Sequence, residues 1–196
     1  ADDIDFLEET NSNNLNIKEN QIIETYSNNE KQLNLNSRSC IVLDRTSKQI
    51  LFGKNEYNKV KMASTTKIMT AIIVIENDDL NKTVEVSKKA ANTGGSRLGL
   101  KTGDKITIHD LLYGLMLCSG NDAAVALAEC TAGSIPDFSE LMNKKASELG
   151  LQNSHFESPH GLDSDGHYTT AYELAKLADH ALNNKTFSQI VGTKTY

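Results

Sequence analysis

The chain has 196 residues, of which 38% are hydrophobic and 23% charged, and its formal net charge is −6. This length fits one domain or part of a somewhat larger one, and the apolar content is too high for global disorder. The acidic balance argues against a nucleic acid as the main partner. The sequence contains no run of about 18 apolar residues, so it predicts no helix that spans a bilayer.

The first 36 residues differ in composition from the rest of the chain. Nine of them are Asn, and no apolar period persists among them. We therefore predict that residues 1–36 form a flexible arm, with a short edge strand near 33–35. The start at Ala1, without Met, fits a mature exported protein and a trimmed chain equally well.

Residues 37–196 are predicted to fold, beginning with a hairpin of strands 39–43 and 49–52. An interior helix follows from Ser64, because residues 68–75 are apolar almost all round, and Ser64 is expected to be its N-cap. Short strands and loops are predicted over 83–108. Further helices are predicted at 109–117, 122–130, 138–149 and 170–182. The order lacks βαβ alternation and predicts an α+β fold, a helical cluster packed on an antiparallel sheet.

The sequence has three cysteines and no C-x-x-C motif: Cys40, Cys118 and Cys130. Because their number is odd, they cannot all pair in intramolecular disulfides. We expect them to be small buried apolar residues.

The first candidate for chemistry is Ser64-Thr65-Thr66-Lys67, an S-x-x-K. As a string it is weak, because chance predicts about one match in a chain of this composition. Its context is stronger, since positions i and i+3 share a helix face and the residues after Lys67 are apolar. Desolvation would lower the pKa of Lys67 and make its amine a base for a serine nucleophile. The alternative is a capped helix start with a solvated lysine.

The second candidate is Ser119-Gly120-Asn121, which separates two apolar helices. Polar side chains at such a place must be paired. They predict either a polar corner that caps the second helix, or a hydroxyl that relays protons beside an amide that holds a substrate carbonyl.

Four segments together resemble the serine D-alanyl-D-alanine carboxypeptidases, which are low-molecular-mass penicillin-binding proteins. They are MASTTKIMTA at 62–71, DLLYGL at 110–115, SGNDAA at 119–124 and SPHGLD at 158–163. The resemblance covers about residues 37–196 and implies the fold shared by penicillin-binding proteins and serine β-lactamases.

The resemblance implies a role for each matching residue. Ser64 is expected to attack the carbonyl of the penultimate D-Ala, with Lys67 as its base. Ser119 is expected to pass a proton to the departing D-Ala amine, and Asn121 to hydrogen-bond the substrate amide. The substrate would be a peptidoglycan stem peptide ending in D-Ala-D-Ala, and β-lactam antibiotics would acylate Ser64. No metal or cofactor is implied, and the expected location is the outer face of the cytoplasmic membrane or the cell-wall space.

The family's third motif, K-T-G, lies roughly 100 residues after S-x-N, whereas this sequence ends 75 residues after Asn121. The letters K-T-G do occur at 101–103, but they precede S-x-N, and we do not expect them to be the functional motif. We therefore expect that the last core strands lie outside these 196 residues. We also expect a product ending at Tyr196 to turn over D-Ala-D-Ala poorly, because the motif holds the substrate carboxylate.

Other readings stay open at this point. His155, His160 and His167 fall close together, but their spacing fits no metal site, and His160 is expected to brace a loop. A serine β-lactamase would need an added base for deacylation, and no downstream Glu suggests one. A non-catalytic fragment that binds penicillin or muropeptides is the third alternative.

Overall fold

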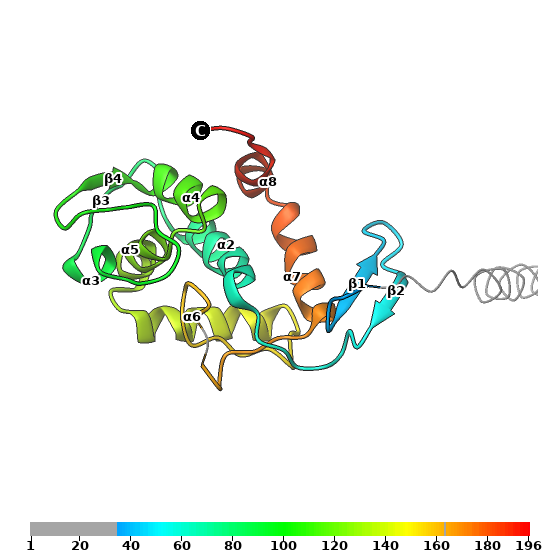
Figure 1. Ribbon diagram of the computed structural model, residues 1–196. Helices are drawn as coiled ribbons and strands as arrows, with labels where there is room; N and C mark the ends of the chain where they lie inside the picture. Colours follow the sequence, from blue (N-terminus) through cyan, green and yellow to red (C-terminus); the bar gives the residue numbers. More distant parts are fainter. Residues whose placement is uncertain (1–34, 163) are drawn as a thin grey trace, which may run out of the picture. The chain divides into compact units, whose positions relative to one another are not determined.

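The computed structural model describes residues 35–162 and 164–196 (Figure 1). The arm predicted at 1–36 lies almost entirely outside the described residues, as does most of the strand predicted near 33–35. In chain order the elements are β1 (Cys40–Leu43), β2 (Ile50–Lys54), the 3₁₀ helix η1 (Ala63–Thr66), α2 (Lys67–Asn77), β3 (Thr83–Glu85), α3 (Lys88–Ala91), β4 (Lys105–Thr107), α4 (Ile108–Leu117), α5 (Asn121–Ala132), α6 (Ile135–Glu148), α7 (Ala171–Leu182) and α8 (Lys185–Gly192).

The α+β prediction is confirmed, and so are the hairpin and the four helices predicted after residue 108. Two short helices, α3 and α8, were not predicted. Among the described residues no helix has the length and apolar character needed to cross a membrane. The prediction of buried cysteines is wrong, because Cys118 is exposed and Cys40 and Cys130 are only partly buried; all three are free thiols.

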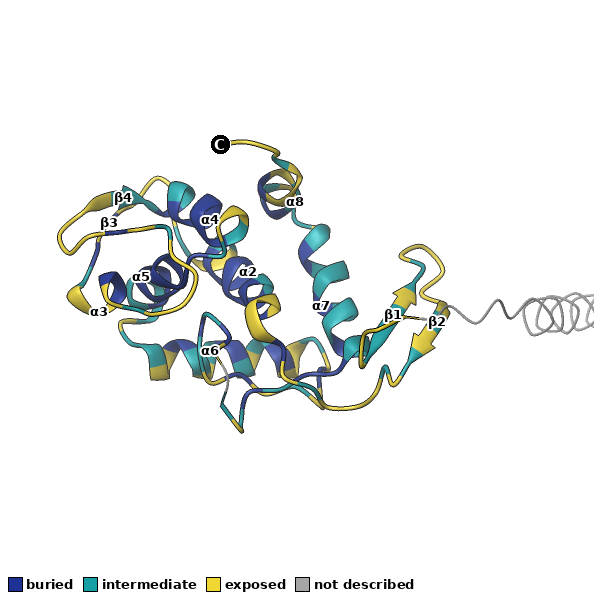
Figure 2. Cartoon of the chain, in the orientation of Figure 1, coloured by how far each residue is buried: buried dark blue, intermediate teal, exposed yellow. Residues whose placement is uncertain are grey.

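Helix α2 is the centre of the helical cluster and contacts α4, α5, α6 and α7 (Figure 1). Its apolar side chains are buried almost all round, as predicted, and Figure 2 shows the same deep burial along α4 and α5. Ala123, Ala124, Ala126 and Ala128 are buried in α5. Such small side chains allow close helix packing, so apolar area is removed from water on several faces at once.

Helices α2 and α5 run parallel, and hydrogen bonds join them at both ends. At their first residues Lys67 Nζ donates to Asn121 Oδ1 at 2.8 Å. At their last turns the Thr131 hydroxyl donates to Asp78 Oδ2 at 2.6 Å. This pairing fixes the register between the two helices that carry the S-x-x-K and S-x-N segments.

The strands form two antiparallel pairs, β1–β2 and β3–β4. The β1–β2 pair has an irregularity between Val42 and Leu43, and β1 packs against α7. Its turn is held on α7 by two ion pairs to Asp179, from Arg45 at 2.9 Å and from Lys48 at 2.6 Å. These charges also lower the pKa of Asp179, chiefly through the hydrogen bond from Lys48.

The predicted N-cap role of Ser64 is wrong. Residues Ala63–Thr66 form a 3₁₀ turn, α2 begins only at Lys67, and neither helix has a side-chain cap. Ala63 takes the left-handed value φ 45°, which costs of order 1–3 kcal/mol for a residue with a Cβ and persists only where the surroundings impose it. The sharp turn leaves Ser64 exposed while Thr66 and Lys67 are buried.

A long segment between α6 and α7 closes over this turn. It is anchored by the antiparallel bridges Val60–Thr169 and His155–Tyr168. Gly161, at φ 84°, lies so close to the turn that a Cβ there would overlap the carbonyl oxygen of Ala63 and approach Thr66 Oγ1 at 2.7 Å. Glycine at this position therefore satisfies both the backbone conformation and the close approach.

We predict that Gly161→Ala lowers the free energy of unfolding far more than Gly133→Ala. Both glycines have φ near 84°, and Gly133 caps α5 in open space. Gly133→Ala should therefore cost only the backbone strain, about 1–2 kcal/mol, whereas Gly161→Ala must also displace backbone. Urea unfolding of the two variants measures the difference, and equal losses would show that the close approach is absent.

Candidate active site

The amine of Lys67 is the centre of the candidate site. Its Nζ donates to Ser64 Oγ at 3.1 Å, to Asn121 Oδ1 at 2.8 Å and to the backbone oxygen of His160 at 2.9 Å. The three acceptors come from η1, α5 and the segment before α7. The expected contact between Ser64 and Lys67, one helical turn apart, is therefore present.

Burial controls the charge of this amine. Lys67 is only 2% exposed, and desolvation lowers its pKa from 10.5 to about 8. On the order of a tenth of the molecules then carry a neutral amine at pH 7. In water that fraction would be smaller by more than two orders of magnitude. The solvated lysine considered as an alternative is not what the structure shows.

Asn121 is 4% exposed and uses both ends of its amide. Its oxygen accepts from Lys67, and its Nδ2 donates to the backbone oxygen of Gly94 at 2.7 Å. These two partners fix which end of the amide is the oxygen, because Lys67 can only donate and a carbonyl can only accept. The second N–H of Nδ2 is not used by either bond.

Ser119 lies in the turn between α4 and α5 in a strained conformation, with φ 54°. Its hydroxyl oxygen is shielded from solvent and has no hydrogen-bond partner within the described residues. In the described part of the chain no hydrogen bond joins this hydroxyl to Ser64 or Lys67, although Ser119 is only two residues from Asn121. Polar atoms that are buried without a partner are uncommon, and strain of this kind concentrates at functional sites.

Two further hydrogen bonds fasten the segment before α7 to helix α2. The Thr70 hydroxyl donates to the backbone oxygen of Pro159 at 2.7 Å, next to the carbonyl that holds Lys67. His167 Nδ1 accepts from Glu157 N–H at 2.9 Å, so its Nε2 carries the proton and donates to Thr66 Oγ1 at 2.7 Å. The buried His167 thus holds the residue that precedes Lys67.

His160 braces its loop, as predicted, because its Nδ1 accepts from Leu162 N–H at 3.1 Å. Burial, followed by the electrostatic influence of Lys67 and then of His167, lowers the pKa of His160 to about 4. Its ring is therefore neutral in the pH range where Lys67 titrates. His155 instead pairs with the backbone oxygen of Gly166, and no cluster of metal-ligating side chains is present in the described part of the chain.

The segment Lys101-Thr102-Gly103 forms an exposed turn before β4. Lys101 N–H donates to Asp104 at 2.8 Å, and Gly103 N–H to the backbone oxygen of Val86 at 2.9 Å. Neither bond connects the turn to Ser64, Lys67 or Asn121.

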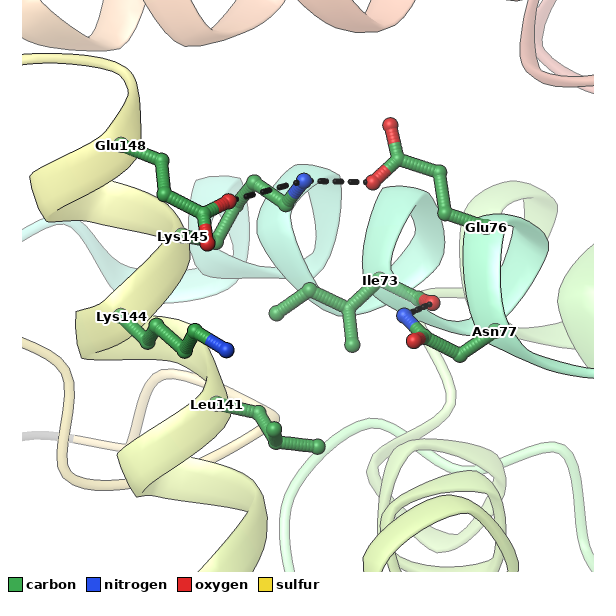
Figure 3. A pocket seen from close by; sticks show the side chains of 7 residues that line it. All are labelled: Ile73, Glu76, Asn77, Leu141, Lys144, Lys145 and Glu148. Atoms are coloured by element: carbon green, nitrogen blue, oxygen red, sulfur yellow. Dashed lines mark hydrogen bonds and ion pairs between the residues drawn. The ribbon is translucent and has the colours of Figure 1, made fainter.

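A pocket of about 270 Å³ lies between α2 and α6 (Figure 3), and Lys67 is not among the residues that line it. Its residue Glu76 is nine positions along α2 from Lys67, or about 13 Å. Lys145 sits between Glu76 at 2.7 Å and Glu148 at 3.4 Å, and the hydrogen bond to Glu76 raises the pKa of Lys145. The charges of Lys145, Glu76 and Glu148 are thus paired with one another. We place the chemistry at Lys67 instead, where a buried amine contacts an exposed hydroxyl.

Sequence reasoning missed the backbone atoms of this site. The carbonyl oxygens of Gly94 and His160 hold Asn121 and Lys67, but a carbonyl carries no residue signature. The glycines beside these positions, Gly95 and Gly161, are sequence signals of turns but do not indicate where a carbonyl points.

Comparison with known proteins identifies the family of the chain. Residues 26–196 match the D-alanyl-D-alanine carboxypeptidase family, starting ahead of the boundary predicted at residue 37. The D-alanyl-D-alanine carboxypeptidase DacF of Bacillus subtilis is 39% identical over 162 residues, which are 80% of this chain and 42% of that protein. Escherichia coli DacD is 39% identical over 158 residues, covering 74% of this chain and 40% of that protein.

Solved structures give the same result. Penicillin-binding protein 6B of Escherichia coli has a TM-score of 0.76 at 36% identity, covering 81% of this chain and 54% of that one. A mutant of a Streptomyces DD-transpeptidase has a TM-score of 0.81 at 34% identity, covering 84% and 68%. The fold is thus that of part of a penicillin-binding protein. The chain belongs to the D-alanyl-D-alanine carboxypeptidase family, and it spans about two fifths of the length of the first curated relatives that it matches.

Proposed function

We propose that the protein removes the terminal D-Ala from peptidoglycan stem peptides through an acyl-enzyme on Ser64, and that β-lactams acylate the same serine. The observation that carries the proposal is the 3.1 Å contact between the buried Lys67 amine and the exposed Ser64 hydroxyl. It occurs in a chain of the carboxypeptidase family. The peptide substrate, the β-lactam ligands and the exported location at the membrane face or in the cell wall belong to the proposal.

The partners of Lys67 determine which proton it can take. An ammonium has three N–H donors, and all three are used by Ser64, Asn121 and His160. When the amine loses a proton it keeps two donors and gains a lone pair. Of the three partner atoms only the Ser64 hydroxyl can donate, so the lone pair must face Ser64 and the bond between them reverses. Deprotonation thus prepares Lys67 to act as the base for Ser64.

In the proposed reaction Ser64 Oγ attacks the carbonyl of the penultimate D-Ala while its proton passes to Lys67. The tetrahedral intermediate collapses with cleavage of the C–N bond, the leaving D-Ala amine takes a proton from Ser119, and Ser119 regains one from Lys67. Lys67, again neutral, then takes a proton from the water that attacks the ester and returns it to the Ser64 oxygen as the ester breaks. The unused N–H of Asn121 Nδ2 would hold a substrate carbonyl, and the Ser64 N–H would contribute to the oxyanion hole.

Labelling with a penicillin tests this assignment. We expect the complete polypeptide that contains these residues to gain the mass of one opened β-lactam, on the peptide carrying Ser64, and Ser64→Ala to gain none. Intact mass and peptide mapping give the measurement, with thermal melting to show that the variant is folded. Rapid release of hydrolysed penicillin would favour a serine β-lactamase. Reversible binding without an adduct would leave only a non-catalytic binding function.

The role of Ser119 has a matched control in Ser139. Both hydroxyl oxygens are shielded from solvent and lack a partner within the described residues, but Ser139 lies in α6. We expect Ser119→Ala to slow acylation of Ser64 by about a hundredfold or more, because a proton relay is lost. Ser139→Ala should leave the rate unchanged within a factor of two. Stopped-flow rates with a chromogenic β-lactam measure both, and equal rates for the two variants would remove Ser119 from the mechanism.

A further inference from the structure

The carboxylate of Asp122, directly after the S-x-N segment, is completely buried. It accepts hydrogen bonds from the backbone N–H groups of Leu98 at 2.9 Å, Gly99 at 2.8 Å and Leu100 at 3.0 Å, and from that of Ala123 at 3.0 Å. Three consecutive N–H groups of one loop therefore converge on a single side chain. We call residues 94–100 the glycine loop.

Asp122 stays ionised in this position. Burial is the largest single influence and raises its pKa, but the backbone donors from Leu98, Leu100, Gly99 and Ala123 together outweigh it, and the pKa is lowered overall. A charged group that is removed from solvent needs hydrogen-bond donors in the protein, and here three of the donors are backbone N–H groups of the glycine loop. The carboxylate thus anchors the glycine loop to the start of α5.

The anchored loop contacts Asn121 at two points. Asn121 N–H donates to the backbone oxygen of Ser96 at 2.8 Å, and Asn121 Nδ2 donates to that of Gly94 at 2.7 Å. The second bond orients the side-chain amide so that its oxygen faces Lys67. A continuous series of hydrogen bonds therefore runs from Asp122 through the glycine loop and Asn121 to the amine beside Ser64.

The fit between these parts leaves no spare room. A Cβ on Gly95 would lie 2.5 Å from Asn121 Nδ2, and one on Gly120 would lie 2.9 Å from Asp122 Oδ1 and 3.2 Å from Leu98 N. Gly120 is the middle residue of S-x-N, so the anchor and the loop press against the segment that carries the site. Gly99, in the same loop, has open space around it.

We propose that Asp122 is a positioning residue, which fixes the glycine loop so that Gly94 orients the Asn121 amide and the amide holds Lys67 beside Ser64. The inference rests on the proposed function, because it assumes that Lys67 activates Ser64. Asp122 itself touches neither the substrate nor the reacting atoms. Its effect should therefore pass entirely through Asn121.

The first test compares Asp122→Asn with Asp78→Asn in the complete polypeptide. Asp78 also binds α5, through Thr131, but at the opposite ends of α2 and α5. Asp122→Asn replaces one carboxylate oxygen by an NH₂ group, which cannot accept a hydrogen bond. Some backbone N–H groups of the glycine loop therefore lose their acceptor. We expect acylation of Ser64 by a chromogenic β-lactam, per folded molecule, to slow by about ten- to a hundredfold, as a 1 Å misplacement would cause. Asp78→Asn should stay within a factor of two.

The second test is a double-mutant cycle, which a merely structural role would not satisfy. If Asp122 acts through Asn121, adding Asp122→Asn to Asn121→Ala should slow acylation by less than a further factor of two. Two glycines supply a matched pair for the same step. Gly95→Ala should slow acylation by at least about tenfold because its Cβ displaces the amide. Gly133→Ala, outside the glycine loop, carries the same backbone strain in open space and should have little effect.

The outcomes separate the two proposals. If the wild-type protein forms no adduct, the proposed function fails. If it forms one but Asp122→Asn and Asp78→Asn react alike, or the losses of Asp122→Asn and Asn121→Ala multiply in full, Asp122 has no positioning role. If Asp122→Asn does not fold, Asp122→Glu replaces it, because this variant keeps the charge but moves the carboxylate by one methylene. Its acylation rate is then measured in the same double-mutant cycle with Asn121→Ala, together with the two glycine variants.

Discussion

The structure of the site depends on the burial of one amine. Lys67 is removed from water almost completely, and its three N–H groups must then find acceptors within the protein. Those acceptors belong to three segments that are distant in the sequence, so each segment has to be fixed by interactions of its own. The bridge at Val60–Thr169, the His167–Thr66 bond and the Asp122 anchor are those interactions. The bridge and the Asp122 anchor bind backbone groups, whereas the His167–Thr66 bond joins two side chains.

Rigidity at this site carries a cost in backbone strain. Ala63 and Ser119 both take left-handed conformations without being glycine, and each lies next to a residue or segment that the proposed mechanism uses. Ala63 turns the chain so that Ser64 is exposed while Lys67, three residues later, is buried. Ser119 turns the chain between α4 and α5 so that Asn121 opens α5 facing Lys67. The packing of α2 among α4, α5, α6 and α7 is what holds these conformations in place.

The sequence predicted most of what depends on side-chain pattern. Apolar runs and capping residues located α2 and α4 to α7, and the i, i+3 spacing anticipated the contact between Ser64 and Lys67. The N-cap predicted for Ser64 was wrong because cap preference reports local chemistry, whereas the chain here forms a 3₁₀ turn against which the distant Gly161 packs closely. The carbonyls of Gly94 and His160 could not be predicted, since every residue has one and only the fold decides where it points.

The central claim is that burial makes Lys67 a base for Ser64, and the most direct measurement is the pKa of its amine. Carbon-13 NMR of the lysine side chains, with Lys67 assigned from the signal lost in Lys67→Met, follows that titration. The account predicts a midpoint near pH 8, and an acylation rate of Ser64 that rises with pH through the same midpoint because the neutral amine is the reactive form. A Lys67 midpoint above 10, or an acylation rate that stays constant from pH 6 to 10, would contradict it.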